Sequence, residues 1–117
     1  MPATATAPAA ATWTTVCRVE DIIPATGVAA LIKGQQIALV RPANDDRIFA
    51  LSNYDPISKA FVLARGIVGD KDGILKITSP IYKQGFDLIT GQCLDDAAIK
   101  IPTYQVKVLN GQISVLA

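Results

Sequence analysis

Hydrophobic and polar positions alternate along most of this chain in short runs that are separated by turn-forming residues. Alternation over such runs indicates β-strands with one buried face. Asn110–Gly111, between the last two runs, is a strong signal for a tight hairpin. No long run has helical periodicity, so we expect an all-β, antiparallel sandwich or small barrel. The predicted strands cover residues 13–19, 27–33, 36–41, 47–52, 74–78, 86–88, 104–109 and 112–116.

The segments between these runs carry weaker predictions. Residues 20–23 are predicted to form one helical turn that ends before Pro24. Residues 61–65 fit either a short strand or a helical turn. Residues 69–73 are predicted to be a charged turn, and residues 92–101 to be irregular.

Two loops interrupt the alternation, at residues 53–58 and 79–86. In the second loop, Pro80 cannot donate to a sheet and Gly85 allows a backbone form that other residues avoid. A loop held between strands is where a β scaffold commonly presents functional groups. This loop, however, contains no Cys, His or Glu, so its shape suggests a site without supplying the usual chemistry.

Composition excludes several function classes. The 117 residues suit one domain, and the formal net charge of +1 gives no basic face of the kind that nucleic acids require. No apolar run approaches the roughly 20 residues that a membrane span needs, so no membrane association is expected. The chain has no histidine, which removes the commonest general base and the commonest zinc ligand.

The two cysteines and the first residues indicate an intracellular protein. Cys17 and Cys93 are expected to be reduced thiols, because no secretory signal precedes the domain. Residues 1–12 are rich in Ala, Thr and Pro and are predicted to be a disordered tail. We therefore expect a domain over residues 13–117 and a cytoplasmic location.

The order of strands and loops resembles the Rieske fold. A cluster-bearing member of that family has a first loop of the form Cys-x-His and a second of the form Cys-Pro-x-His. Here Ser79 and Tyr82 stand at the cysteine and histidine positions of the second loop. Asp55 and Ile57 stand at those of the first, where the alignment also allows a shift of one residue. The resemblance implies two loops side by side at one end of the fold.

All four ligand positions are therefore substituted. A Rieske cluster needs two thiolates and two imidazoles, whereas Asp, Ser and Tyr offer oxygen and Ile offers nothing. We expect no iron–sulfur cluster and no other cofactor in this chain. Without a metal, side-chain packing and hydrogen bonds must hold the loops together, and Ile57 and Tyr82 are the expected residues to fill the space.

The resemblance narrows to the small subunit of assimilatory NAD(P)H-dependent nitrite reductase. The segments that carry it are residues 53–58, 62–70, 79–84 and 91–96. That family implies a partner, a large subunit with FAD, an iron–sulfur cluster and sirohaem, which reduces nitrite to ammonium in nitrate assimilation. It implies for this chain a supporting role with no active site of its own.

Four residues are candidates for contact with the partner, and three of them also have a structural interpretation. Tyr82 could instead be half-buried and close its loop, and Arg65 and Lys83 could be ordinary solvated charges. Asp55 is more simply a residue that caps a turn than a functional acid. The candidates are Tyr54, Arg65, Tyr82 and Lys83.

Two other functions remain as alternatives. The first is a cluster-less Rieske-like interaction module that serves another redox partner. The second is a small enzyme that acts through Asp55, Ser79 or Tyr82. This one is disfavoured because none of these residue types is a base poised near neutral pH.

Overall fold

The computed structural model describes residues 11–117, which form twelve strands and two short 3₁₀ turns. The predicted all-β antiparallel architecture is confirmed. The first ten positions of the predicted tail lie outside the described residues. Thr12 is described, and it exchanges two backbone hydrogen bonds of 3.2 Å with Ala117.

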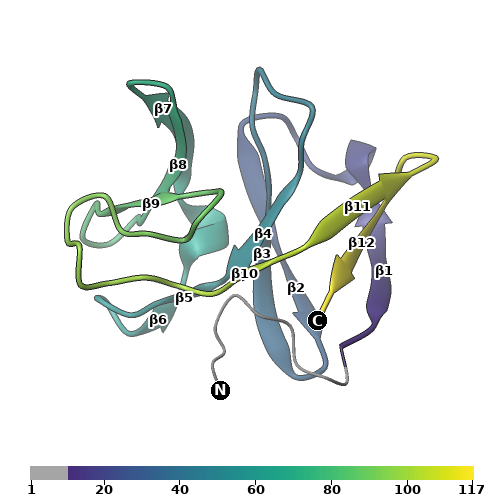
Figure 1. Cartoon of the computed structure of the whole chain (residues 1–117), viewed down its shortest axis with the longest axis horizontal. Coiled ribbons are helices and arrows are strands. Elements are labelled where there is room, and N and C mark those ends of the chain that lie inside the picture. The colour runs from purple at the N-terminus through teal and green to yellow at the C-terminus, as the bar shows by residue number, and fades with distance from the viewer. Residues whose placement is uncertain (1–10) are drawn as a thin grey trace.

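Two antiparallel sheets form what we call the sandwich lobe, residues 11–52 and 102–117 (Figure 1). The first sheet has the strand order β1-β12-β11, and the second has the order β10-β4-β3-β2. A 3₁₀ turn, η1 (Val19–Asp21), follows β1. The strands are β1 (Trp13–Arg18), β2 (Thr26–Ile32), β3 (Gln35–Arg41), β4 (Phe49–Ser52), β10 (Thr103–Tyr104), β11 (Val106–Leu109) and β12 (Gln112–Leu116).

Residues 53–101 form a small lobe, which lies on the left in Figure 1. It contains a two-stranded sheet, β5-β6, and a three-stranded sheet in the order β7-β8-β9. The second 3₁₀ turn, η2 (Leu63–Arg65), connects them. The strands are β5 (Tyr54–Asp55), β6 (Ala60–Phe61), β7 (Ile67–Lys71), β8 (Ile74–Thr78) and β9 (Gly85–Asp87).

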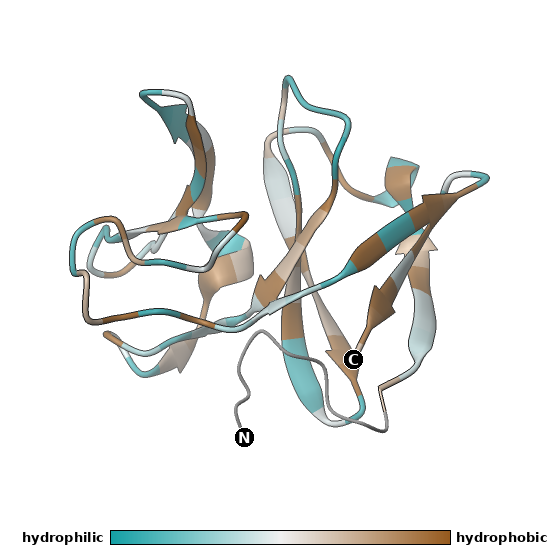
Figure 2. Ribbon diagram, in the orientation of Figure 1, coloured by the Kyte–Doolittle hydropathy of each residue, from teal (hydrophilic) through white to brown (hydrophobic). Residues whose placement is uncertain are grey.

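Strand β3 contributes to two hydrophobic cores. Successive side chains of a strand point to opposite faces. Ile37 and Leu39 therefore pack between the two sheets of the sandwich lobe, while Val40 packs against the small lobe with Phe86 and Ile77. Figure 2 shows that the tip of the loop between β3 and β4, by contrast, is hydrophilic. The sheet thus joins both lobes through buried apolar contacts.

Several predicted elements need correction. Residues 104–109 are two strands, because the chain leaves β4 after Tyr104 and joins β12 from Val106. Residues 69–73 are mostly strand, since β7 pairs with β8 up to Lys71 and only Asp72–Gly73 turns, both with positive φ. The expected turn at 20–23 is the 3₁₀ turn η1.

Other local predictions are confirmed. Asn110 and Gly111 have φ of 52° and 77°, as a tight hairpin requires. Segment 61–65 is divided between the end of β6 and η2, so both expected forms occur. Across residues 11–117, no helix has the length and apolar character to cross a membrane.

Candidate functional site

Two loops of the small lobe meet through a short hydrogen bond between buried side chains. Asp55 ends β5 and Ser79 follows β8, and both side chains are fully buried. Ser79 Oγ donates to Asp55 Oδ2 at 2.6 Å. The prediction that these two loops lie side by side is therefore confirmed, and a hydrogen bond joins them directly.

The two loops also share one backbone form, which we call the matched turns. Their sequences are Asp-Pro-Ile-Ser-Lys at residues 55–59 and Ser-Pro-Ile-Tyr-Lys at residues 79–83. In each turn the N–H of the fifth residue donates to the carbonyl of the first, at 2.7 Å and 3.2 Å respectively. The first side chain accepts from the N–H of the third residue, at 2.9 Å and 3.3 Å. Each proline suits its position because it has no N–H to leave unpaired.

Asp55 is the centre of the hydrogen-bond network. Its carboxylate accepts from Ser79 Oγ, from Ser58 Oγ at 2.8 Å and from the backbone N–H of Ile57. Burial raises the pKa of this carboxyl, but the hydrogen bonds from Ser79, Ser58 and Ile57 outweigh it, and the pKa is lowered. Asp55 is thus a buried carboxylate that remains charged and caps its own turn, as the structural interpretation predicted.

The side chains present do not fit a Rieske cluster. Asp55 and Ser79 bond to each other, so their oxygens already satisfy one another at the point where two thiolates would bind iron. Ile57 has no ligand atom, and the sequence contains no histidine. Among residues 11–117, no three His, Cys, Asp or Glu side chains are grouped so as to hold a metal ion.

Ile57 and Tyr82 were expected to fill the space between the loops, and the structure contradicts this for Tyr82. Ile57 is partly buried and packs against the core of the small lobe. Tyr82 is 59% exposed, so the prediction that it closes the loop is wrong. The reason is that the Ser79–Asp55 hydrogen bond and the backbone bonds of the matched turns already close the gap. Its phenol is left at the surface.

The remaining candidate contact residues lie at the surface of the same lobe. The Tyr54 ring packs against the Phe61 ring, with 5.0 Å between centroids, and Phe61 is exposed. Arg65 ends η2 and is exposed, as is Lys83. Sequence analysis missed Phe61 and Lys59, although the repeated Pro-Ile in the two loops was visible and pointed to matched positions.

Sequence analysis also missed the role of Asn53. Its side chain is buried, and Oδ1 accepts from the backbone N–H of Ala64 at 2.7 Å while Nδ2 donates to Gln36 Oε1 at 3.1 Å. The side chain therefore ties the first loop to η2 and to β3. Nothing in the neighbourhood of this asparagine along the chain indicates a partner eleven residues away.

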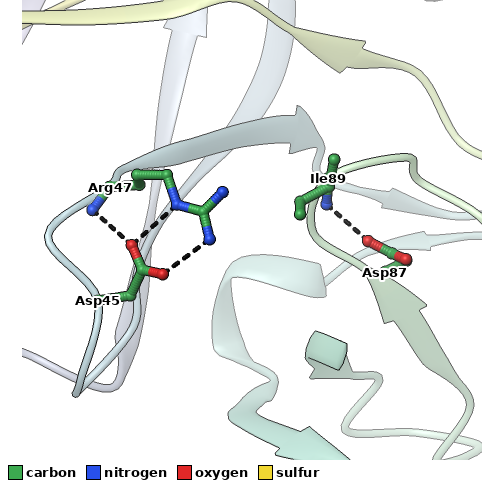
Figure 3. Close-up of polar contacts among 4 residues, drawn as sticks. All are labelled: Asp45, Arg47, Asp87 and Ile89. Atoms are coloured by element: carbon green, nitrogen blue, oxygen red, sulfur yellow. Dashed lines mark hydrogen bonds and ion pairs between the residues drawn. The ribbon is translucent and has the colours of Figure 1, made fainter. Parts of the chain in front are cut away.

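An open groove of about 450 Å³ lies where the two lobes meet. Arg47 lies on one side, over the Phe49 ring, and forms two side-chain hydrogen bonds with Asp45 that hold the pKa of that carboxyl at about 2. Ile89 lies on the other side, where its N–H donates to Asp87 (Figure 3). Arg47 and the Ile89 N–H, which line the groove, therefore each have an acidic partner.

Comparison with known proteins places this geometry in a family. The Rieske-like [2Fe-2S] domain family matches residues 12–116. A nitrite reductase (NADH) small subunit from Salmonella typhimurium is 40% identical over 103 residues, which are 88% of this chain and 95% of that protein. The chain belongs to the nitrite reductase small subunit family. The resemblance noted from the sequence is therefore confirmed.

Two further relatives add to this assignment. The solution structure of the nitrite reductase NAD(P)H small subunit from Erwinia carotovora has a TM-score of 0.76 to this small-subunit fold, with 47% identity. The match covers 90% of this chain and 81% of that one. A nitrite reductase NAD(P)H large subunit from Klebsiella oxytoca is 37% identical over 103 residues, 88% of this chain but only 11% of the relative. A domain like this small subunit is thus part of a much longer chain there.

Proposed function

We propose that this chain is the small subunit of an NAD(P)H-dependent nitrite reductase and supports the reduction of nitrite to ammonium by a large subunit. The observation that carries the proposal is the near full-length match to nitrite reductase small subunits at 40% identity. The Klebsiella large subunit adds a second argument, because a related domain and a nitrite reductase share one chain there. Proteins joined in one chain in one organism commonly associate as separate chains in another.

The contribution of this chain is structural. Asp55 and Ser79 satisfy each other and Ile57 has no ligand atom, so the matched turns offer no site through which electrons would pass. The large subunit is expected to hold FAD, sirohaem and an iron–sulfur cluster. The small subunit would stabilise the active form of that enzyme in the cytoplasm, through a surface that includes Tyr54, Arg65, Tyr82 and Lys83.

Co-expression tests the proposal directly. The large subunit from the same organism is purified with and without this chain, and the rate of NAD(P)H-dependent ammonium formation from nitrite is measured for both preparations. We expect the chain to elute with the large subunit and to raise the rate or extend its lifetime. The proposal is overturned if the chain elutes alone and the rate is the same in both preparations.

The same preparation separates the proposal from its alternatives. If this chain binds a different redox protein and never the nitrite reductase, it is an interaction module with another partner. If the isolated chain turns over nitrite with a reduced donor, it is an enzyme in its own right. The Asp46→Asn variant carries an exposed substitution in the β3–β4 loop and controls for the effect of a substitution as such. It should change neither the association of this chain with the large subunit nor the rate of ammonium formation.

A further inference from the structure

Both matched turns end on a lysine in a backbone conformation that lysine rarely adopts. Lys59 and Lys83 have φ of 59° and 66°, in the left-handed region. Glycine adopts this region without steric cost, whereas a side chain is disfavoured there. Two turns of the same form therefore place a cationic side chain at the position where glycine would fit best. Residues held in an unfavourable backbone conformation are concentrated at functional sites, which suggests a function for these two lysine side chains.

Neither lysine is neutralised by a neighbouring acid among the described residues. The two ion pairs found over residues 11–117 are Arg18–Glu20 and Arg47–Asp45, both in the sandwich lobe. Lys83 Nζ donates only to a backbone carbonyl, that of Pro80, at 3.4 Å. The nearest acid in the turns, Asp55, is buried, and its oxygens already accept from Ser79, Ser58 and Ile57. Asp95 lies close to the second loop, since its Oδ2 accepts from the Gly85 N–H at 2.8 Å, but it forms no ion pair with Lys83. The matched turns therefore carry two cationic side chains that have no ion-pair partner among the described residues.

Large apolar side chains are exposed beside these two lysines. Ile81 and Tyr82 belong to the second turn and are 46% and 59% exposed. Phe61 follows the first turn by two residues and is 54% exposed, with Tyr54 packed against it. Exposed aromatic and apolar side chains that are rimmed by charge are typical of protein-binding surfaces. We call Lys59, Phe61, Ile81, Tyr82 and Lys83 the turn surface.

The first and last strands of the described chain lie in the sandwich lobe, whereas the matched turns lie in the small lobe. Thr12 and Ala117 pair with each other in the sandwich lobe, and Figure 1 shows the C-terminus in that lobe, to the right of β5 and β6. In the Klebsiella large subunit a related domain is part of a longer chain, and a domain is joined to the rest of such a chain through its ends. The turn surface stays free to contact the rest of such a protein.

We propose that the turn surface binds an acidic patch on the nitrite reductase large subunit, with Lys59 and Lys83 supplying the charge and Ile81, Tyr82 and Phe61 the apolar contact. This inference rests on the proposed function and names the surface through which it operates. Charge complementarity brings the two proteins together and sets their orientation. The aromatic and aliphatic side chains of the turn surface become buried when the complex forms, and they hold the two proteins together.

Binding of purified small-subunit variants to the purified large subunit tests the surface. The double variant Lys59→Glu/Lys83→Glu is compared with Lys71→Glu/Lys100→Glu, which changes the net charge equally at exposed sites outside the turns. We expect Kd to rise about tenfold or more for the first variant and to stay within about twofold for the second. The affinity of the wild-type chain should fall as salt is raised, because salt screens exposed charges.

A second pair of variants tests the apolar part. Ile81→Ala/Tyr82→Ala should weaken binding by a similar factor, while Ile23→Ala/Leu31→Ala, which shortens exposed side chains of the sandwich lobe, should not. Thermal unfolding of each variant shows whether it is folded. Equal weakening by test and control variants, or weakening by neither, overturns the turn surface and leaves the proposed function standing. If the wild-type chain itself does not bind the large subunit, the proposed function fails, and this inference fails with it.

Discussion

The hydrogen bond between Ser79 and Asp55 should be the most sensitive point of the small lobe. Asp55 accepts three hydrogen bonds while fully buried, and each hydrogen bond to a charged group is worth about 1.5–3 kcal/mol against about 0.5–1.5 for a neutral one. Asp55→Asn removes the charge and keeps the shape, so it should lower the free energy of unfolding by about 2–3 kcal/mol. Ser79→Ala removes one of the three donors and should cost about 2 kcal/mol.

Stability should also depend on pH through this carboxyl. The pKa of Asp55 is lower in the folded chain than in the unfolded chain, where it is about 3.9. The stabilisation is therefore complete above about pH 5, and it is lost as the pH falls through the folded-state pKa. Asp55→Asn cannot lose this contribution, so the difference in unfolding free energy between wild type and variant should shrink on acidification.

Urea unfolding at about pH 7 and at about pH 3 measures both the destabilisation and its pH dependence. The proteins compared are wild type, Asp55→Asn, Ser79→Ala and the double variant. The double variant should be less destabilised than the sum of the two single variants, because the side chains act on each other. Asp46→Asn, an exposed substitution, should stay within about 0.5 kcal/mol of wild type. If Asp55→Asn unfolds like wild type at about pH 7, the network does not hold the loops together and the argument is wrong.

Three further predictions concern the scaffold and the metal. The Gly91→Ala variant should unfold at a much lower urea concentration than the Gly34→Ala variant. Both glycines have φ of 79°, but a Cβ at position 91 would lie 2.1 Å from the Ile101 carbonyl oxygen, whereas a Cβ at position 34 would have no atom within 4 Å. Asn53→Ala should cost about 1–3 kcal/mol in chemical unfolding, because the buried N–H of Ala64 loses its acceptor. Metal analysis of protein purified without oxygen should find no stoichiometric iron, and a visible iron–sulfur absorption band would refute this.

Much of the fold followed from local pattern, and the exceptions have physical causes. The hairpin at Asn110–Gly111 was predictable because few other dipeptides accept positive φ twice. The break at Gln105 was not, since the alternation of residues 104–109 is uninterrupted and only tertiary pairing moves the chain from one sheet to the other. Strand β7 was missed because Gly69 and Asp70 are poor strand formers, and its pairing with β8 outweighs that preference.

The candidate site, too, was predictable from the sequence only in part. That the loops around Asp55 and Ser79 adjoin could be anticipated, because their positions along the chain matched a family with two apposed loops. The orientation of Tyr82 could not, because it depends on what else fills the gap. A hydroxyl and a carboxylate 2.6 Å apart need far less room than a metal cluster, so the turns close without the phenol. Tyr82 is therefore left at a surface that also carries Lys83 and Ile81.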